Sequence, residues 1–82
     1  MHTDTKQRIR MFHGAMMYAE KTSPVPFEAM AAYAFCVENG YCLGVIPGEI
    51  FVRDTLLPLV RMRQIKAIEL PNNRQRYVLP LK

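Results

Sequence analysis

The sequence is poor in the features that mark specialised chemistry. Its 82 residues include no tryptophan, two cysteines and four glycines, and they contain no glycine-rich loop of the kind that cradles phosphate groups. The longest apolar run, residues 29–37, is far shorter than the roughly 20 residues that cross a bilayer. We therefore expect neither a membrane span nor a nucleotide-binding loop.

The two cysteines do not have a spacing that indicates a metal site. Zinc ligands usually come in pairs such as C-x-x-C, whereas Cys36 and Cys42 stand singly and only His2 and His13 could join them. The chain also begins without a basic and apolar leader, which predicts a cytoplasmic protein with reduced, buried thiols. No metal and no cofactor is predicted.

The acidic residues and His13 give no pattern of catalytic groups. The seven acids are scattered along the chain, and His13 has no neighbouring nucleophile or carboxylate in the sequence. General acid and base catalysis needs such groups to be positioned together. We therefore expect a protein that is not an enzyme.

What the sequence does contain is typical of a small folded domain. Half of the residues are hydrophobic and 22% are charged, a balance that favours a packed core over disorder. A chain of this length can build only one core, so residues 1–82 are expected to form a single domain. Lysine and arginine outnumber the acids by 11 to 7, which permits an anionic partner without requiring one.

Helical periodicity is clearest over residues 5–21. Asp4 and Thr5 offer side-chain oxygens that can cap this helix, and Gly14 inside it costs about 1 kcal/mol relative to alanine. Apolar residues recur every three or four positions, which predicts one buried face. These residues are Ile9, Phe12, Met16 and Ala19.

A second helix is predicted over residues 26–38, after a proline-rich linker. Pro26 suits the first helical position, and Asn39-Gly40 supplies a left-handed stop. Residues 29–37 carry no charge, so this helix has no polar face and is expected to be covered on more than one side. One of those sides is predicted to be an interface.

A third helix follows a loop over residues 41–47, and its apolar side extends to Ile65. Pro58 interrupts the pattern. Either Asp54 caps a new helix in which Pro58 lies in the first turn, or one longer helix kinks at Pro58. The chain is therefore expected to contain three helices, or four if the last one divides.

The C-terminal stretch predicts a two-stranded β-hairpin. Residues 66–70 and 74–81 flank Pro71-Asn72-Asn73, and asparagine tolerates the positive φ that a tight turn requires. Alternation places Tyr77 and Leu81 on one face of the second strand and its arginines on the other. The sequence as a whole predicts an α+β fold.

Two segments resemble the winged helix-turn-helix superfamily. They are VRDTLLPLVRMRQI (52–65) and RQRYVL (74–79), which look like a recognition helix that runs into strand, wing and strand. The resemblance covers about residues 5–81 and implies a third helix in the DNA major groove, with the hairpin wing on the flanking backbone. The chain departs from the family in the long connection 39–48, in Pro58, and in Gln64 where a glycine is usual.

The resemblance implies a DNA-binding surface of arginines. By position, Arg53 would contact a base or a phosphate from the helix, and Arg74 and Arg76 would be the wing contacts. Arg61 and Arg63 complete the set, although cations in the last turn of a helix are also favoured by its dipole. A guanidinium group can bind phosphate or guanine in a bidentate way. This interpretation predicts a small transcriptional regulator that binds double-stranded DNA as a homodimer.

The apolar second helix supports a different hypothesis. In it, the same fold is a protein–protein interaction module that docks a larger partner through residues 26–38. Met17, Tyr33 and Phe35 are the predicted interface residues. This hypothesis is favoured over DNA binding if the arginines are dispersed, or neutralised by the domain's own carboxylates.

Overall fold

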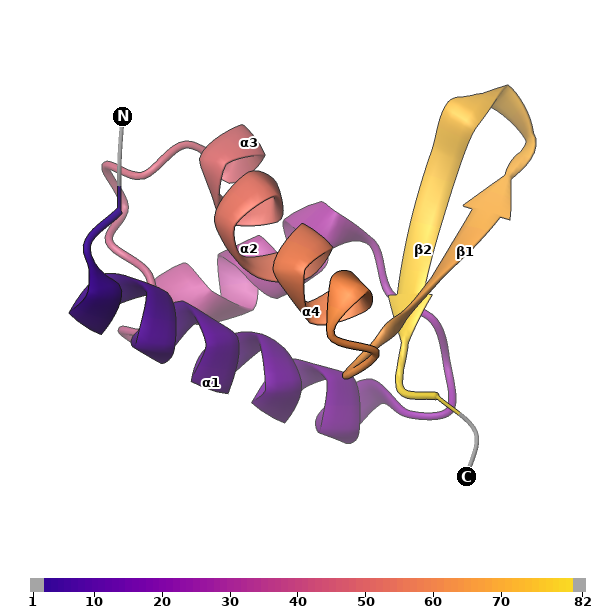
Figure 1. Cartoon of the computed structure of the whole chain (residues 1–82), viewed down its shortest axis with the longest axis horizontal. Coiled ribbons are helices and arrows are strands. Elements are labelled where there is room, and N and C mark those ends of the chain that lie inside the picture. Colours follow the sequence, from indigo (N-terminus) through magenta and orange to yellow (C-terminus); the bar gives the residue numbers. More distant parts are fainter. Residues whose placement is uncertain (1–2, 81–82) are drawn as a thin grey trace.

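The structure, a computed structural model that describes residues 3–80, consists of a helical body and a C-terminal hairpin (Figure 1). The predicted α+β class is confirmed. The helices are α1 (Thr5–Thr22), α2 (Ala29–Glu38), α3 (Gly48–Phe51), a π-helical turn (Val52–Leu56) and α4 (Leu57–Arg61). The strands are β1 (Lys66–Leu70) and β2 (Arg74–Val78), which are joined by a short 3-10 turn (Pro71–Asn73).

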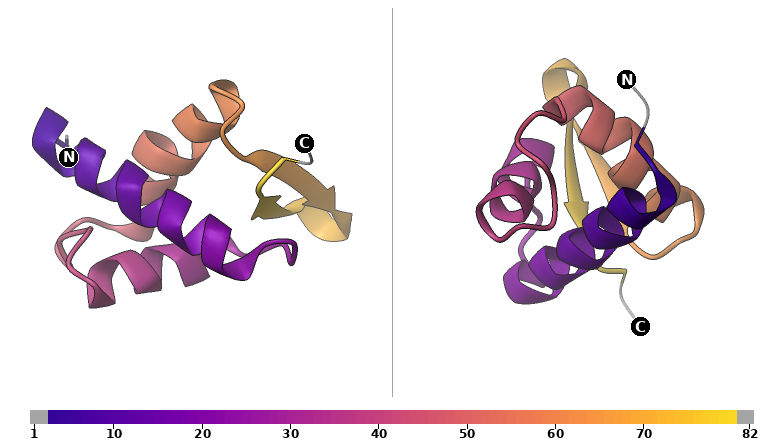
Figure 2. Two further views of the ribbon diagram at one scale, coloured as in Figure 1. Left: turned by 90° about the horizontal axis from the view of Figure 1, so that it is seen from below. Right: turned by 90° about the vertical axis from the view of Figure 1, so that its left-hand side faces the viewer.

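Helix α1 holds the other helices together. It packs against α2 and against the π-helical turn, and the hairpin lies at the end of the domain where α1 finishes (Figure 2). The core fills the space between these helices and the base of the hairpin. Its largest fully buried side chains are Phe51, Met11, Leu56, Ile65, Thr55 and Cys36.

Helix α1 begins as predicted, and its predicted core face is confirmed at Ala19 and, as partly buried residues packed against the core, at Phe12 and Met16. Asp4 caps it, because its Oδ1 accepts a hydrogen bond of 2.7 Å from the backbone N–H of Gln7. Ile9 is 60% exposed, so its predicted place in the core is wrong. The buried positions are those with small side chains and one methionine: Met11, Gly14, Ala15 and Ala19.

Gly14 explains why small residues face α2. A Cβ atom at this position would lie 2.6 Å from Cβ of Tyr41 and 2.8 Å from Sγ of Cys36. Real Cβ atoms do not approach other atoms so closely, so the glycine lets α1 lie directly against the C-terminal end of α2. Close packing therefore selects glycine here, despite its poor helix propensity.

Helix α2 starts later than predicted. Pro26 is not its first residue, because Phe27 is extended and pairs with Tyr77 of β2 in an antiparallel bridge, and Glu28 occupies the N-cap position. The predicted stop is confirmed by the positive φ of 77° at Gly40. Helix α2 contacts α1, α3 and β2, so the predicted cover on more than one side is confirmed, while Met30, Ala34 and Glu38 stay exposed.

Helix α3, the π-helical turn and α4 follow one another without a break and form one long helix, residues 48–61, which contains Pro58. Phe51, Leu56 and Leu57 all have right-handed helical dihedral angles, so the alternative in which Asp54 caps a new helix is wrong. The N–H of Leu57 donates to the carbonyl of Val52, five residues back. This π-helical turn ends at Leu56, two residues before Pro58. It accommodates the proline, which has no N–H to donate.

The long helix ends at Arg61, before the predicted Ile65. Arg63 takes the left-handed conformation with a φ of 61°, and the N–H of Gln64 donates to the carbonyl of Leu59 at 2.9 Å. This pattern closes a helix and is usually built on glycine. Ile65 is consequently buried at the base of the hairpin.

The hairpin has the predicted turn and a fixed attachment to the helices. Asn72 and Asn73 both have positive φ, at 67° and 60°, as the sequence predicts. Strand β2 ends at Val78, so its predicted extension through residues 79 and 80 is wrong, and the predicted strand residue Leu81 lies outside the described residues. Phe27 and Tyr77 exchange two backbone hydrogen bonds of 2.8 Å each, which fasten the hairpin to the segment before α2.

We predict that Gly14→Ala destabilises the fold by about 1–3 kcal/mol, because overpacking outweighs the gain in helix propensity. Urea denaturation followed by circular dichroism measures this. Gly44→Ala is the control: the nearest atom to its added Cβ would be 3.9 Å away on Val37, and we expect a change within about 0.5 kcal/mol. Equal stability of Gly14→Ala and the unaltered chain would contradict the close contact.

Candidate functional site

The five arginines implied by the resemblance lie in three separate places. Arg53 is on the π-helical turn, Arg61 and Arg63 are at the end of α4, and Arg74 and Arg76 are on β2. Arg74 pairs with Leu70 at the far end of the hairpin, which projects away from α4 (Figure 1). At about 3.4 Å per residue, β1 alone extends some 14 Å from its base toward Arg74.

Glu28 contacts both arginines of the hairpin, and its single negative charge offsets part of their positive charge. Its Oε1 accepts from Nη2 of Arg74 at 3.0 Å and also contacts Nη1 of Arg76. The bridge between Phe27 and Tyr77 brings this carboxylate beside β2. Exposed ion pairs of this kind contribute at most about 1 kcal/mol, but they place a negative charge where a phosphate would have to bind.

Arg53 is engaged by the residue that follows it. Its Nε and Nη2 donate to Oδ1 and Oδ2 of Asp54 at 2.8 and 3.1 Å. Thr3 donates a further hydrogen bond of 2.8 Å to the same carboxylate. The hydrogen bond from Arg53 is the main cause that lowers the pKa of Asp54 to about 2. Arg53 is therefore bound to a carboxylate of its own helix.

The exposed side of the long helix is mixed in character. Glu49, Arg53, Leu57 and Arg61 are exposed at intervals of four residues. Together with the hairpin and the neighbouring Glu28, this side carries five cations (Arg53, Arg61, Lys66, Arg74 and Arg76) and four carboxylates (Glu28, Glu49, Asp54 and Glu69), so its net charge is only one positive unit. Most of the positive surplus of the chain therefore lies elsewhere.

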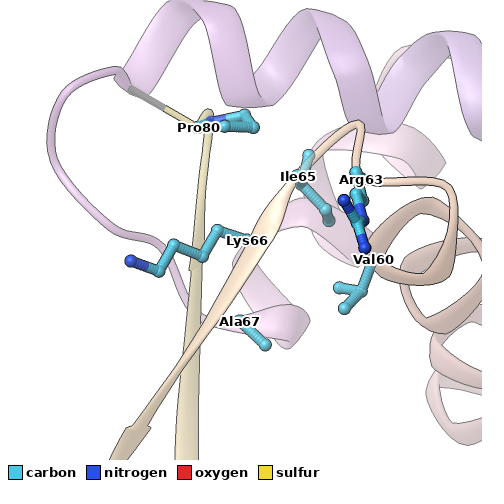
Figure 3. A pocket seen from close by; sticks show the side chains of 6 residues that line it. All are labelled: Val60, Arg63, Ile65, Lys66, Ala67 and Pro80. Carbon is cyan, nitrogen blue, oxygen red and sulfur yellow. The ribbon is translucent and has the colours of Figure 1, made fainter. Parts of the chain in front are cut away.

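Positive charge without a partner gathers at the corner between α4 and β1. Arg61, Arg63 and Lys66 are exposed, and none of them has an ion pair within residues 3–80. A shallow hollow of about 340 Å³ lies at this corner (Figure 3). Its walls are Val60, Arg63, Ile65, Lys66, Ala67 and Pro80.

An apolar surface runs along α2 as far as the exposed Glu38 at its last position, and over the loop that follows the helix. The loop runs beside the helix, because Tyr33 Oη donates to the carbonyl of Ile46 at 2.6 Å and Gly44 lies against Val37. Neither 29–37 nor 42–48 contains a charged residue. Three large apolar side chains are mostly exposed there, with Val45 reaching 74%. We call this the α2 surface and define it by Met30, Ala34, Leu43 and Val45.

Two of the three predicted interface residues lie together. The ring of Tyr41 stacks on Phe35, with 6.3 Å between centroids, and its hydroxyl donates to Sδ of Met17 at 3.1 Å. Tyr33 lies on the loop side of α2, where its ring meets the edge of Phe51. Met17 and Phe35 thus form a cluster through Tyr41, and Tyr33 borders the α2 surface.

Sequence reasoning missed Met30, Leu43 and Val45 as surface residues. Residues 42–48 were interpreted only as a connecting loop, although an uncharged run in an exposed loop is itself a signal. The exposed side of α2 could not be chosen from the sequence, because residues 29–37 show no contrast between polar and apolar positions.

The thiols are buried, as predicted, and poorly suited to react. Burial, with Cys42 nearby as a second cause, raises the pKa of Cys36 to about 12, and burial also raises the pKa of Cys42. A thiol with a raised pKa stays protonated and is a weak nucleophile and ligand. No group of three metal-binding side chains is found in the described part of the chain, and His2 lies outside it.

Comparisons with known proteins supply no relative. No family model, curated protein or solved structure matches the chain. Among residues 3–80, no helix has the length and apolar character needed to span a membrane. Function must therefore be argued from the surfaces of this chain alone.

We predict that the stabilising effect of Asp54 depends on pH. Because its pKa is lowered to about 2 from an ordinary 3.8, its contribution is fully present above about pH 4 and is lost as the pH falls through 2. Thermal melting should show Asp54→Asn less stable than the unaltered chain at pH 6, with a gap that closes toward pH 2. Glu49→Gln, at the start of the same helix, is the control. A gap that does not change with pH would contradict the ion pair.

Proposed function

We propose that this chain is a protein-interaction module of winged-helix type that docks a partner protein through the α2 surface. One observation carries the proposal: Met30, Leu43 and Val45 are 54%, 56% and 74% exposed on a surface without charge. Contiguous exposed apolar patches in small soluble domains are typical of binding sites.

Physical magnitudes favour this surface over the arginines. Covering half or more of a valine, leucine or methionine side chain contributes about 1–2 kcal/mol, so these three residues offer several kcal/mol to a partner. The small side chains of Ala34 and Gly44 let a partner approach closely. By contrast, Arg53, Arg74 and Arg76 must leave Asp54 and Glu28 before they can contact another anion.

The winged-helix part of the proposal is supported by the order and attachment of the elements. Helices α1 and α2 and the long helix precede the hairpin, and Phe27 joins the hairpin to the segment between α1 and α2. The connection over residues 39–47 remains longer than a tight helix-turn-helix turn. This departure affects the DNA-reading geometry and leaves the α2 surface intact.

We predict that a photoreactive amino acid at position 34 forms a discrete crosslinked product in the source cells, because Ala34 is exposed on α2 about one helical turn after Met30. The measurement is denaturing electrophoresis followed by mass spectrometry. Val45→Glu should abolish the product, since a carboxylate in an apolar interface is costly to bury.

The control for this experiment carries the photoreactive amino acid at Glu20, which is exposed on α1. A product at twice the mass of the chain would identify a second copy as the partner. The same products from both positions, or a product that survives Val45→Glu in a folded chain, would contradict the proposal.

A second candidate function, DNA binding by a transcriptional regulator, is favoured by one specific observation. Arg61 and Arg63 are exposed and have no carboxylate partner in the described part of the chain. Such residues can contact phosphates without first breaking an internal pair. A homodimer that brings two of these corners together would double the contact with duplex DNA.

We predict for this candidate that duplex affinity falls steeply with salt and that Arg61→Ala and Arg63→Ala each reduce the logarithmic salt slope by about one. Glu28→Gln should raise affinity about threefold, because it releases Arg74 and Arg76. Fluorescence anisotropy over a salt series measures both effects. Glu20→Gln makes the same charge change at a distance from the hairpin and is the control. Identical slopes in all variants would rule out this surface.

A further inference from the structure

The hairpin leaves one strand edge open, and the bridge to Phe27 shows which backbone groups are exposed there. Tyr77 gives its N–H and its carbonyl to Phe27. It therefore cannot exchange hydrogen bonds with Ala67, which lies opposite it on β1. In an antiparallel ladder, bonded and non-bonded pairs alternate. Lys66, Ile68 and Leu70 thus bond to β2, and the N–H and carbonyl groups of Ala67 and Glu69 are directed away from it.

These outward groups have no partner in the described chain. No backbone or side-chain hydrogen bond to Ala67 or Glu69 exists within residues 3–80 outside the ladder itself. The sheet has only β1 and β2, so β1 is an edge strand along its whole length. Native proteins usually block or cover such edges, and an open edge is a template for another strand.

The surroundings of this edge are apolar and positively charged. On one side lies the hollow walled by Val60, Ile65 and Ala67, with Arg63 at its margin (Figure 3). Lys66 points to the opposite side of β1. It reaches a second hollow of about 680 Å³ that contains no acidic residue and is walled by Ser23, Pro24, Pro26, Lys66, Ile68, Val78, Leu79 and Pro80.

We propose that the free edge of β1 binds an extended peptide segment of a partner protein, in which apolar and acidic side chains alternate. The segment would add a third strand by hydrogen bonding to Ala67 and Glu69, a known mode of peptide recognition. This site is separate from the α2 surface, and the proposal does not depend on binding at that surface.

The charge and the two faces of β1 determine the chemistry of the segment. Side chains of an added strand alternate between the faces, as they do in β1. Those beside Ile65 and Ala67 enter the apolar hollow next to α4. Their neighbours lie beside Lys66, where a carboxylate is complementary. Glu69 shares the face of Ala67, so it is not opposed to these acidic side chains.

The test uses a capped, fluorescein-labelled peptide in which valine and glutamate alternate. Its control has the same composition, with all valines before all glutamates, so that charge is equal and only the alternation is lost. We expect the alternating peptide to bind at least about fivefold more tightly by fluorescence anisotropy. On the isotope-labelled chain, it should slow amide hydrogen exchange of Ala67 and Glu69 at least about tenfold by nuclear magnetic resonance.

Two variants locate the binding. Ala67→Pro removes an outward N–H that the fold itself does not use, and proline is tolerated at strand edges, so it should abolish binding while the chain stays folded. Where that variant fails to fold, the pair Arg63→Glu and Lys66→Glu should weaken binding about tenfold. Ala67→Ser keeps the N–H and is the control that should bind as before.

Three outcomes would overturn the proposal. One is equal binding of the alternating and block peptides. Another is protection of amides on the α2 surface while those of Ala67 and Glu69 stay unprotected. The third is protection of Ala67 and Glu69 that rises with protein concentration in the absence of peptide, because a second copy of the chain would then occupy the edge.

Discussion

The backbone pairing of Phe27 with Tyr77 determines much of the architecture. Two hydrogen bonds of 2.8 Å join the segment between α1 and α2 to β2, and both side chains are buried, with their ring centroids 5.9 Å apart. This pairing attaches the hairpin to the helices and brings Glu28, the next residue, beside Arg74 and Arg76. It also sets which groups of β1 face solvent. The pairing of Phe27 with Tyr77 thus determines both the position of Glu28 beside the hairpin arginines and the open edge of the hairpin.

Charge and apolar character are separated on this domain. Asp54 pairs with Arg53, and Glu28 contacts both Arg74 and Arg76, whereas the exposed cations at the corner between α4 and β1 have no ion pair within residues 3–80. The α2 surface carries no charge at all. Since internal pairing of exposed charges contributes little stability, its main effect is on which surfaces remain attractive to other molecules. That separation suits a domain that meets partners through distinct surfaces.

The sequence predicted the elements whose signals are local. The cap at Asp4, the stop at Gly40 and the asparagine turn of the hairpin follow from side-chain and backbone preferences, and all three are confirmed. The buried positions Met11, Gly14 and Ala15 of α1 were missed, because the close contact of Gly14 is with Tyr41 and Cys36, which are distant in sequence. The pairing of Glu28 with the hairpin arginines and the open side of α2 likewise depend on contacts that no periodicity reveals.

The π-helical turn before Pro58 also determines how the two ends of the domain are oriented. Such a turn holds one residue more than an α-helical turn, and each residue of an α-helix corresponds to about 100° of rotation. Because the extra residue is taken up within this one turn, α4, the corner at Arg63 and the hairpin keep about the rotation around the helix axis that a regular α-helix one residue shorter would give them. The turn therefore adds a residue before Pro58 without moving the hairpin away from Phe27.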